Sequence, residues 1–152
     1  MVGAPLLIES GYFRAKFAQE EAAAAGGLPF TIVRATQFFE FLGGVADMQT
    51  VDGIVRLPAA DAQPAAVTEV AGAIAEIAAG TAANGVVEVA GPERRPLAEI
   101  VGAWLRWAGD PRSVAETDTA RFAGARIGRE TLVPGPEALL MSTPFDVWLA
   151  NR

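Results

Sequence analysis

The sequence predicts an α/β fold built around a parallel sheet, and three observations carry this prediction. Helix-forming segments alternate with short apolar runs, of which Phe30–Ala35 has the composition of a strand buried on both faces. Glycine or proline separates most of these segments. The 152 residues contain no internal repeat and no long linker. We therefore expect a single α/β domain that spans residues 1–152.

The first helix is expected from Tyr12 to Ala25. Its residues are strong helix formers, Ser10 suits the N-cap position, and Gly26 and Gly27 provide the stop. After a Leu-Pro pair, the run FTIVRA predicts the first strand. The chain thus begins with a helix that leads into a strand.

The middle of the chain predicts two further helices. QFFEFLGGVADM favours a short helix, and GIVRLP and AQPAAV favour brief extended segments. TEVAGAIAEIAAG is the clearest amphipathic helix, with Thr68 expected as its N-cap and Gly80 as its stop. A strand is expected next, at Val86–Ala90.

The last third predicts a helix at each end of an ambiguous stretch. RPLAEIVGAWLRWAG favours a helix with Pro96 in its first turn, and the tail favours one with Thr143 as N-cap and Pro144 at its first position. Between the two helices we expect only a short strand near Val114 and a short helix near Ala120.

The composition excludes several classes of function. The 12 basic and 18 acidic residues give a net charge of -6, which argues against binding to nucleic acid or anionic lipid. The chain has no cysteine and no histidine, so we expect no disulfide, no metal site and no histidine base. Apolar runs fall short of the roughly 18 residues that a membrane span needs, and the first residue is not followed by a basic region and cleavage site. We therefore expect a cytoplasmic protein without nucleic-acid or membrane partners.

The only tyrosine and the only lysine of the chain, Tyr12 and Lys16, stand four residues apart. On a helix this spacing places both side chains on one face, with Cβ atoms roughly 5–6 Å apart. A free phenol, with a pKa of about 10, is a poor base at neutral pH, and a neighbouring ammonium stabilises the phenolate. The pair is therefore a candidate for proton transfer. The alternative makes Tyr12 a surface aromatic and Lys16 an ion-pair partner of Glu20.

Three segments together resemble the second half of an NmrA-like, atypical short-chain dehydrogenase/reductase: SGYFRAKFAQEEAAAAGGLPFTIVRATQFFEFLGG, VRLPAADAQPAAVTEVAGAIAEIAAG and GVVEVAGPERRPLAEIV. They lie within residues 10–101. The resemblance implies the C-terminal half of a doubly wound, parallel, Rossmann-type sheet with a small substrate-lobe region. It also implies an NAD or NADP cofactor and a small carbonyl or quinone-like substrate.

The same resemblance assigns roles to the candidate residues. Tyr12 would be the general acid/base, and Lys16 would stabilise its phenolate and bind the nicotinamide ribose. The segment after the first strand would approach the nicotinamide with its backbone amides and a hydroxyl; it consists of Ala35, Thr36, Gln37 and Phe38. The alternative makes this segment a strand end and helix cap. Gln63 and Pro64 fit a structural role as well as a functional one.

The chain also departs from the family pattern. It has no G-x-G-x-x-G loop for a pyrophosphate, and the family's catalytic serine would fall before Met1. We expect the chain to begin where the dinucleotide-binding half would end. Three functional alternatives remain: an oxidoreductase, a non-catalytic NAD(P)-sensing or protein-interaction module, or an inactive gene fragment.

The absence of that half has a consequence for the first strand. A strand that loses one parallel neighbour presents unpaired N–H and C=O groups beside apolar side chains, and such an edge pairs with other chains. We therefore expect residues 30–35 to lie at a free sheet edge. We expect the chain to self-associate or aggregate, or to fold only with a partner that supplies the missing strands.

Overall fold

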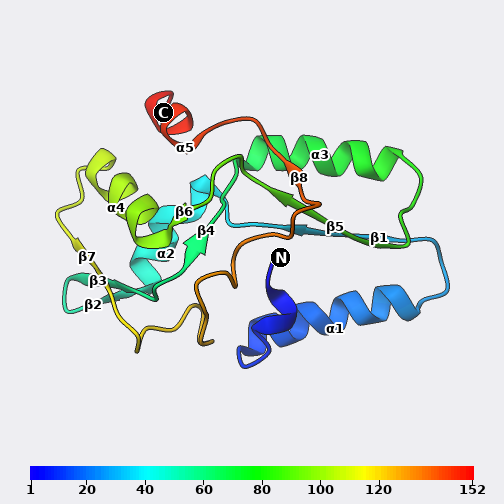
Figure 1. Ribbon diagram of the computed structural model, residues 1–152, viewed down its shortest axis with the longest axis horizontal. Coiled ribbons are helices and arrows are strands. Elements are labelled where there is room, and N and C mark those ends of the chain that lie inside the picture. Colours follow the sequence, from blue (N-terminus) through cyan, green and yellow to red (C-terminus); the bar gives the residue numbers. More distant parts are fainter.

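The computed structural model describes residues 1–152 and confirms an α/β fold of five α-helices and eight short strands (Figure 1). The helices are α1 (Gly11–Ala25), α2 (Leu42–Met48), α3 (Val67–Ala79), α4 (Leu97–Trp107) and α5 (Phe145–Ala150), with 3-10 turns η1 (Ala4–Leu6) and η2 (Phe39–Phe41). The strands are β1 (Thr31–Ala35), β2 (Thr50–Val51), β3 (Ile54–Leu57), β4 (Asp61–Ala62), β5 (Gly85–Ala90), β6 (Arg95–Pro96), β7 (Ser113–Glu116) and β8 (Leu139–Leu140). No helix is both long enough and apolar enough to span a bilayer.

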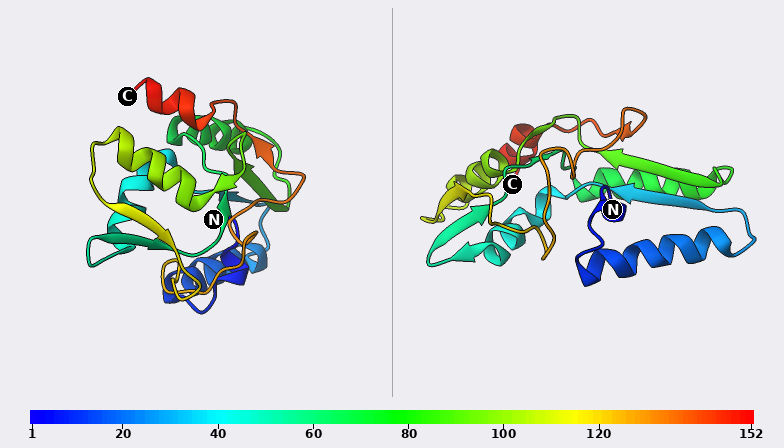
Figure 2. Two further views of the ribbon diagram at one scale, coloured as in Figure 1. Left: turned by 60° about the vertical axis from the view of Figure 1, so that its left-hand side comes forward. Right: turned by 60° about the horizontal axis from the view of Figure 1, so that its bottom comes forward.

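The strands form three small sheets, not one continuous sheet. The first has the order β1-β5-β8 and is entirely parallel. In the second, of order β2-β3-β7, β2 pairs antiparallel and β7 parallel with β3, while β4 and β6 form an antiparallel pair. Figures 1 and 2 show α3 on one side of β1 and β5 and α1 on the other. The β1-β5-β8 sheet therefore carries the helix-strand alternation that the sequence predicts.

The hydrophobic core is divided unequally. A cluster of 19 buried residues joins η1 and the start of α1 to α2, β3, α4 and α5. A separate cluster of only four buried residues, Ala65, Val70, Ala73 and Val89, lies between α3 and the β1-β5-β8 sheet. Since burial of apolar surface is the main stabilising term, most of the stabilisation comes from the larger cluster.

Several expected elements are confirmed to within one residue at each end. These are α1, β1 and β5, and β7 lies where a strand near Val114 was expected. Residue 27, expected in the helix stop, has a φ of 72°, a left-handed conformation that only glycine adopts without strain. Glycine stops and apolar periodicity are local signals, so they locate these elements well.

The prediction that Thr68 caps α3 is wrong. The helix begins at Val67, and Ala66 takes the N-cap position in place of Thr68. The N–H of Val67 donates a hydrogen bond to the Glu40 carboxylate, at 3.0 Å. A carboxylate distant in sequence therefore caps this helix, because it supplies the acceptor that a local Thr would otherwise provide.

Pro96 and Pro144 were expected in the first turns of their helices, but each lies one residue before its helix begins. Pro96 pairs with Asp61 in the β4-β6 ladder, which keeps its backbone extended. Pro144 is the N-cap of α5, also with extended backbone, so Thr143 does not cap that helix. The N–H of Phe145 donates to the Glu93 carboxylate, at 3.3 Å.

The short helix expected near Ala120 is absent. Ala120 instead donates its N–H to the carbonyl of Thr117, and Phe122 and Ala125 exchange two backbone hydrogen bonds. Ala123 and the following glycine both have positive φ, 48° and 88°. Left-handed residues end a right-handed helix, so this segment forms turns.

Strand β1 is confirmed, but its burial on both faces is not. All five of its residues are only half-buried. Its single strand partner is β5, so its other edge is free, as the sequence predicts. At the carboxyl end of this edge, the N–H of Val2 donates to the carbonyl of Ala35 at 3.0 Å.

Candidate functional site

Tyr12 and Lys16 lie in the first two turns of α1, on the same face, as the spacing predicts. The Lys16 Nζ atom lies 5.7 Å from the centroid of the Tyr12 ring. Tyr12 is 59% exposed, and its ring packs edge-on against Phe13, with 5.2 Å between ring centroids. Phe13 belongs to the larger core cluster. The buried phenylalanine thus anchors the helix start and leaves the tyrosine ring in contact with solvent.

The alternative ion pair of Lys16 with Glu20 is wrong. Lys16 donates a hydrogen bond to Gln19 Oε1, at 3.3 Å, while Glu20 binds Arg34 of β1. The Arg34 Nη2 atom lies 2.6 Å from Glu20 Oε2, and Nε donates to the same carboxylate. Hydrogen bonding to Glu20 raises the pKa of Arg34 against the opposing effect of burial. Glu20 therefore ties α1 to β1 and leaves the Lys16 ammonium beside Tyr12.

Thr36 and Gln63 join the carboxyl end of β1 to the end of β5. Thr36 donates its N–H to the Val89 carbonyl at 2.9 Å and its hydroxyl to the Gln63 carbonyl at 2.7 Å. The Gln63 amide Nε2 donates to the Gly91 carbonyl at 2.8 Å, and the Gly91 N–H donates back to the Gln63 carbonyl. The hydroxyl proton of Thr36 and the amide of Gln63 are therefore engaged within the protein.

Pro64 has a structural role at the same junction. A Cβ atom at position 91 would overlap the Pro64 carbonyl oxygen, so only glycine fits there. This close approach keeps the segment after β4 in contact with the end of β5.

Gln37 differs from the other buried polar residues. Its side chain is buried, with 8% exposure for the residue, yet neither Nε2 nor Oε1 has a hydrogen-bond partner. The backbone N–H groups of Gln37 and Phe38 also donate to no other protein atom. A buried polar group without a partner costs about 1–3 kcal/mol. The end of β1 therefore has three nitrogen atoms whose N–H groups lack a protein partner, Gln37 Nε2 and the backbone nitrogens of Gln37 and Phe38, and one unpaired oxygen, the buried Gln37 Oε1.

The remaining candidate residues contribute backbone and apolar surface. The Ala35 carbonyl is bonded to Val2, and Phe38 packs against the smaller core cluster. Figure 1 shows that α1 begins near the middle of the molecule, on the side towards which β1 runs. The Tyr12 pair and the four residues after β1 thus lie in the same part of the molecule, although no hydrogen bond connects them.

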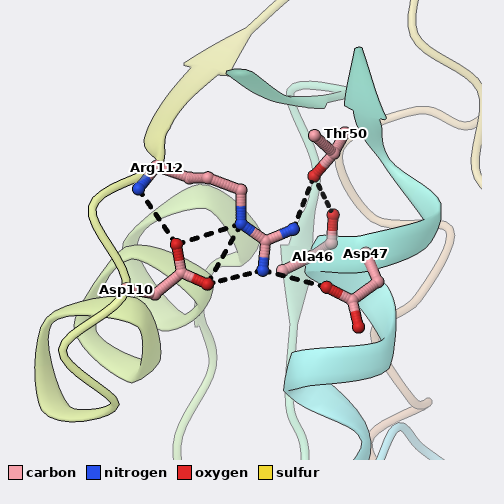
Figure 3. Close-up of polar contacts among 5 residues, drawn as sticks. All are labelled: Ala46, Asp47, Thr50, Asp110 and Arg112. Atoms are coloured by element: carbon pink, nitrogen blue, oxygen red, sulfur yellow. Dashed lines mark hydrogen bonds and ion pairs between the residues drawn. The ribbon is translucent and has the colours of Figure 1, made fainter. Parts of the chain in front are cut away.

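A polar cluster centred on Arg112 was not predicted from the sequence (Figure 3). The guanidinium lies 2.6 Å from Asp110 Oδ2 and 2.9 Å from Asp47 Oδ1, and donates to Thr50 Oγ1 at 2.8 Å. The Thr50 hydroxyl in turn donates to the Ala46 carbonyl. Hydrogen bonding to Asp110 and Asp47 raises the pKa of Arg112. Through these contacts the Arg112 guanidinium joins the end of α2 to the loop before β7.

Two surface grooves, of about 280 and 290 Å³, are lined by residues other than the six candidates. No three acidic residues lie close enough to ligate a metal ion. The carboxyl end of β1 lines neither groove, and it is a candidate site because of the unpaired amide of Gln37.

Comparison with models of known protein families and with curated protein sequences found no match for this chain. The resemblance to NmrA-like reductases therefore stays a prediction that rests on three segments of the sequence. The unpaired polar groups at the end of β1 are the stronger basis for inferring a function.

Proposed function

We propose that this chain carries the nicotinamide end of an NAD(P)-dependent oxidoreductase site, within a doubly wound sheet of the Rossmann type. The unpartnered amide of Gln37 is the observation that carries the proposal. In open α/β sheets, ligands bind outside the carboxyl ends of the parallel strands, and Gln37 lies just beyond the carboxyl end of β1.

The residues present fit a nicotinamide. Its carboxamide offers one carbonyl oxygen and one NH₂ group, which complement the free donors and the free Oε1 acceptor at Gln37 and Phe38. When bound, a nicotinamide supplies hydride transfer. The chain has no glycine-rich loop for the pyrophosphate, so we expect only weak binding of the whole dinucleotide.

Tyr12 and Lys16 would act on the substrate. The Tyr12 hydroxyl holds the proton that a substrate carbonyl oxygen receives when it is reduced to an alcohol. The Lys16 ammonium lies 5.7 Å from the centre of the ring and would place a positive charge near the phenolate that remains. The exposure of Tyr12 leaves its ring accessible to a small molecule from solvent.

An NMR titration of the isotope-labelled chain with NADH or NADPH tests the binding step. We expect weak, saturable shifts centred on the amides of Gln37 and Phe38. Gln37→Met keeps the length of the side chain and should abolish them, whereas Gln49→Met should not. Gln49 is a suitable control because its amide is already bonded to the Arg121 carbonyl. Shifts confined to other regions, or unchanged in Gln37→Met, would contradict the proposal.

The same variant has a second readout in the free protein. Because Gln37→Met removes a buried unpaired amide, it should raise the free energy of unfolding by about 1–3 kcal/mol. A destabilised Gln37→Met protein would show that the Gln37 amide has hydrogen-bond partners in solution.

Micromolar binding of NAD(P)H in the titration would show that this chain binds the pyrophosphate without a glycine-rich loop.

Turnover distinguishes an oxidoreductase from an NAD(P)-sensing module. If the chain, alone or with a complementing dinucleotide-binding partner, reduces a quinone or carbonyl, Tyr12→Phe should lower the rate roughly 10²–10⁴-fold. The variant keeps the ring and its contact with Phe13. A rate within a factor of about two of the parent would give Tyr12 a structural role, since a lost general acid costs far more.

A further inference from the structure

We propose that the side chains of Arg94 and Arg129 form a surface site for a phosphate group, with the buried carboxylate of Asp61 holding the two guanidinium groups together. This inference does not depend on the proposed oxidoreductase chemistry, because its test needs neither a nicotinamide nor turnover. It rests on the position of the two arginines, on their unused donors and on the exposure of the one other carboxylate that binds them.

Strand β4 brings the two arginines together. Ala62 pairs with β6 and also forms an isolated bridge with Leu132, so the segments that follow Arg94 and Arg129 lie on opposite sides of β4. The N–H of Asp61, the other residue of β4, donates to the Arg129 carbonyl at 2.7 Å. The fold therefore places the backbone of both arginines close to Asp61.

The Asp61 carboxylate orients the two guanidinium groups. The residue is only 8% exposed, and it accepts a hydrogen bond from Arg94 Nε at 3.0 Å and one from Arg129 Nη1 at 2.8 Å. Because one carboxylate holds both groups, the two positive charges lie near each other before any ligand binds. Such preorganisation lowers the cost of binding an anion.

Several donors of this pair are unused. A guanidinium has five N–H donors in a plane, an arrangement that matches the oxygens of a phosphate. Within the protein, Arg94 donates only through Nε and Nη2, and Arg129 only through Nη1. In Arg112, by contrast, all three side-chain nitrogens donate to protein atoms. Since the side chains of Arg94 and Arg129 are 40% and 59% exposed, a phosphate in solution can reach their remaining donors.

Glu130 is the group that a bound phosphate would displace. Its carboxylate accepts a hydrogen bond from Arg94 Nη2 at 2.9 Å, and its side chain is 74% exposed. An ion pair this exposed contributes little, so a phosphate that binds both arginines can replace it. The net charge of -6 disfavours the binding of anions elsewhere on the chain.

An NMR titration of the isotope-labelled full chain with inorganic phosphate, at an ionic strength held constant with sodium chloride, tests the site. We expect saturable shifts at the Nε–H signals of Arg94 and Arg129. Arg129→Gln should weaken binding about tenfold or more, because it removes charge-assisted hydrogen bonds. Arg126→Gln removes the same charge from another exposed residue of the segment and should leave the affinity nearly unchanged.

Glu130→Gln should have the opposite effect. It removes the competing carboxylate and should tighten phosphate binding by up to about fivefold, the range set by the small contribution of an exposed ion pair. Glu137→Gln makes the same charge change at another exposed residue and should have a much smaller effect. An ion-pair network with a purely structural role predicts no such gain.

The same titration with glycerol phosphate distinguishes a phosphate ester from the free ion as the ligand. Binding at least as tight as that of inorganic phosphate would assign the site to an ester, whereas binding of inorganic phosphate alone would assign it to the free ion. Shifts that do not saturate, equal losses in the two arginine variants, or no gain in Glu130→Gln would overturn the proposal.

Discussion

Gly91 is the position near the candidate site where the surrounding backbone leaves the least room for a side chain. A Cβ atom there would overlap the Pro64 carbonyl, and the glycine exchanges hydrogen bonds with Gln63. Gly91→Ala should lower the free energy of unfolding by about 1–3 kcal/mol, as overpacking typically does. Denaturant unfolding measures this change.

Gly72→Ala in α3 is the matched control for Gly91→Ala. Nothing lies within 4 Å of the Cβ position at residue 72. Alanine is a better helix former than glycine, so this variant should gain about 0.5–1 kcal/mol. If both variants changed stability in the same direction, the close approach at Gly91 would not be a constraint in solution.

At the residue scale, local and distant contacts differ in how far the sequence predicts them. The spacing of Tyr12 and Lys16 predicts their shared face, because helical geometry alone determines it. The roles of Thr36 and Gln63 could not be predicted, because they bond to each other across 27 residues and Gln63 bonds to Gly91 across 28. The unpaired amide of Gln37 likewise depends on which groups fold around it.

At the scale of elements, the amino terminus of α3 depends on Glu40. The carboxylate accepts hydrogen bonds from Val67 N–H, from Trp148 Nε1 and from the Arg152 guanidinium. Glu40→Ala removes the cap of α3 and its links to the last helix together. It should lower the free energy of unfolding by about 1–2 kcal/mol, the cost of losing a helix cap.

Thr68→Ala separates this distant cap from the local cap that the sequence predicts. Thr68 lies inside the helix, and its side chain makes no capping hydrogen bond. The variant should therefore leave thermal unfolding nearly unchanged. A greater loss of stability in Thr68→Ala than in Glu40→Ala would show that Thr68, and not Glu40, caps α3.

Glu69 attaches the tail of the chain to α3. Its carboxylate accepts hydrogen bonds from the Ser142 N–H, the Ser142 hydroxyl and the Thr143 N–H. Burial opposes ionisation, but these hydrogen bonds favour it more, and the pKa of Glu69 lies below its ordinary value of 4.5. The folded state therefore holds the ionised form more strongly than the unfolded chain does.

The direction of this pKa shift determines the expected pH dependence. Above pH 4.5 the stabilisation from Glu69 is fully present, and it is lost as the pH falls through that value towards the lower pKa of the folded state. The stability difference between the parent protein and Glu69→Gln should therefore shrink in acid. Glu76→Gln, a change at an exposed residue of the same helix, is the matched control for removing a carboxylate from α3. A difference that is constant with pH would contradict the role of the carboxylate.

Element type was more predictable than element boundary or sheet membership. Glycine stops and apolar runs are local, and they locate α1, β1 and β5. Helix starts at α3, α4 and α5 are displaced because distant groups, such as Glu40 and the β4-β6 ladder, decide them. The turns at Ala123 and Gly124 depend on backbone angles for which the alanine gives no signal.

At the scale of the molecule, the sequence predicts one parallel sheet, whereas the structure has three small sheets and two hydrophobic cores of unequal size. The β1-β5-β8 sheet is only three strands wide, and β8 contributes just two residues. Beyond it, β3 pairs with β7 above the larger core. The sequence shows that a strand is apolar, but it does not show which distant strand will be its neighbour.

This division predicts two levels of local stability. The α4 helix buries Leu97, Ile100, Val101 and Leu105 in the 19-residue cluster, whereas α3 buries only Val70 and Ala73 in a cluster of four. Local opening is easiest where few apolar contacts must be broken. Native-state hydrogen exchange should therefore give slower exchange at the amide of Leu105 than at the amide of Ala73, although both lie inside helices. Equal protection at the two amides would mean that the cores open together, and that the sheet bearing the candidate site is as stable as the rest of the molecule.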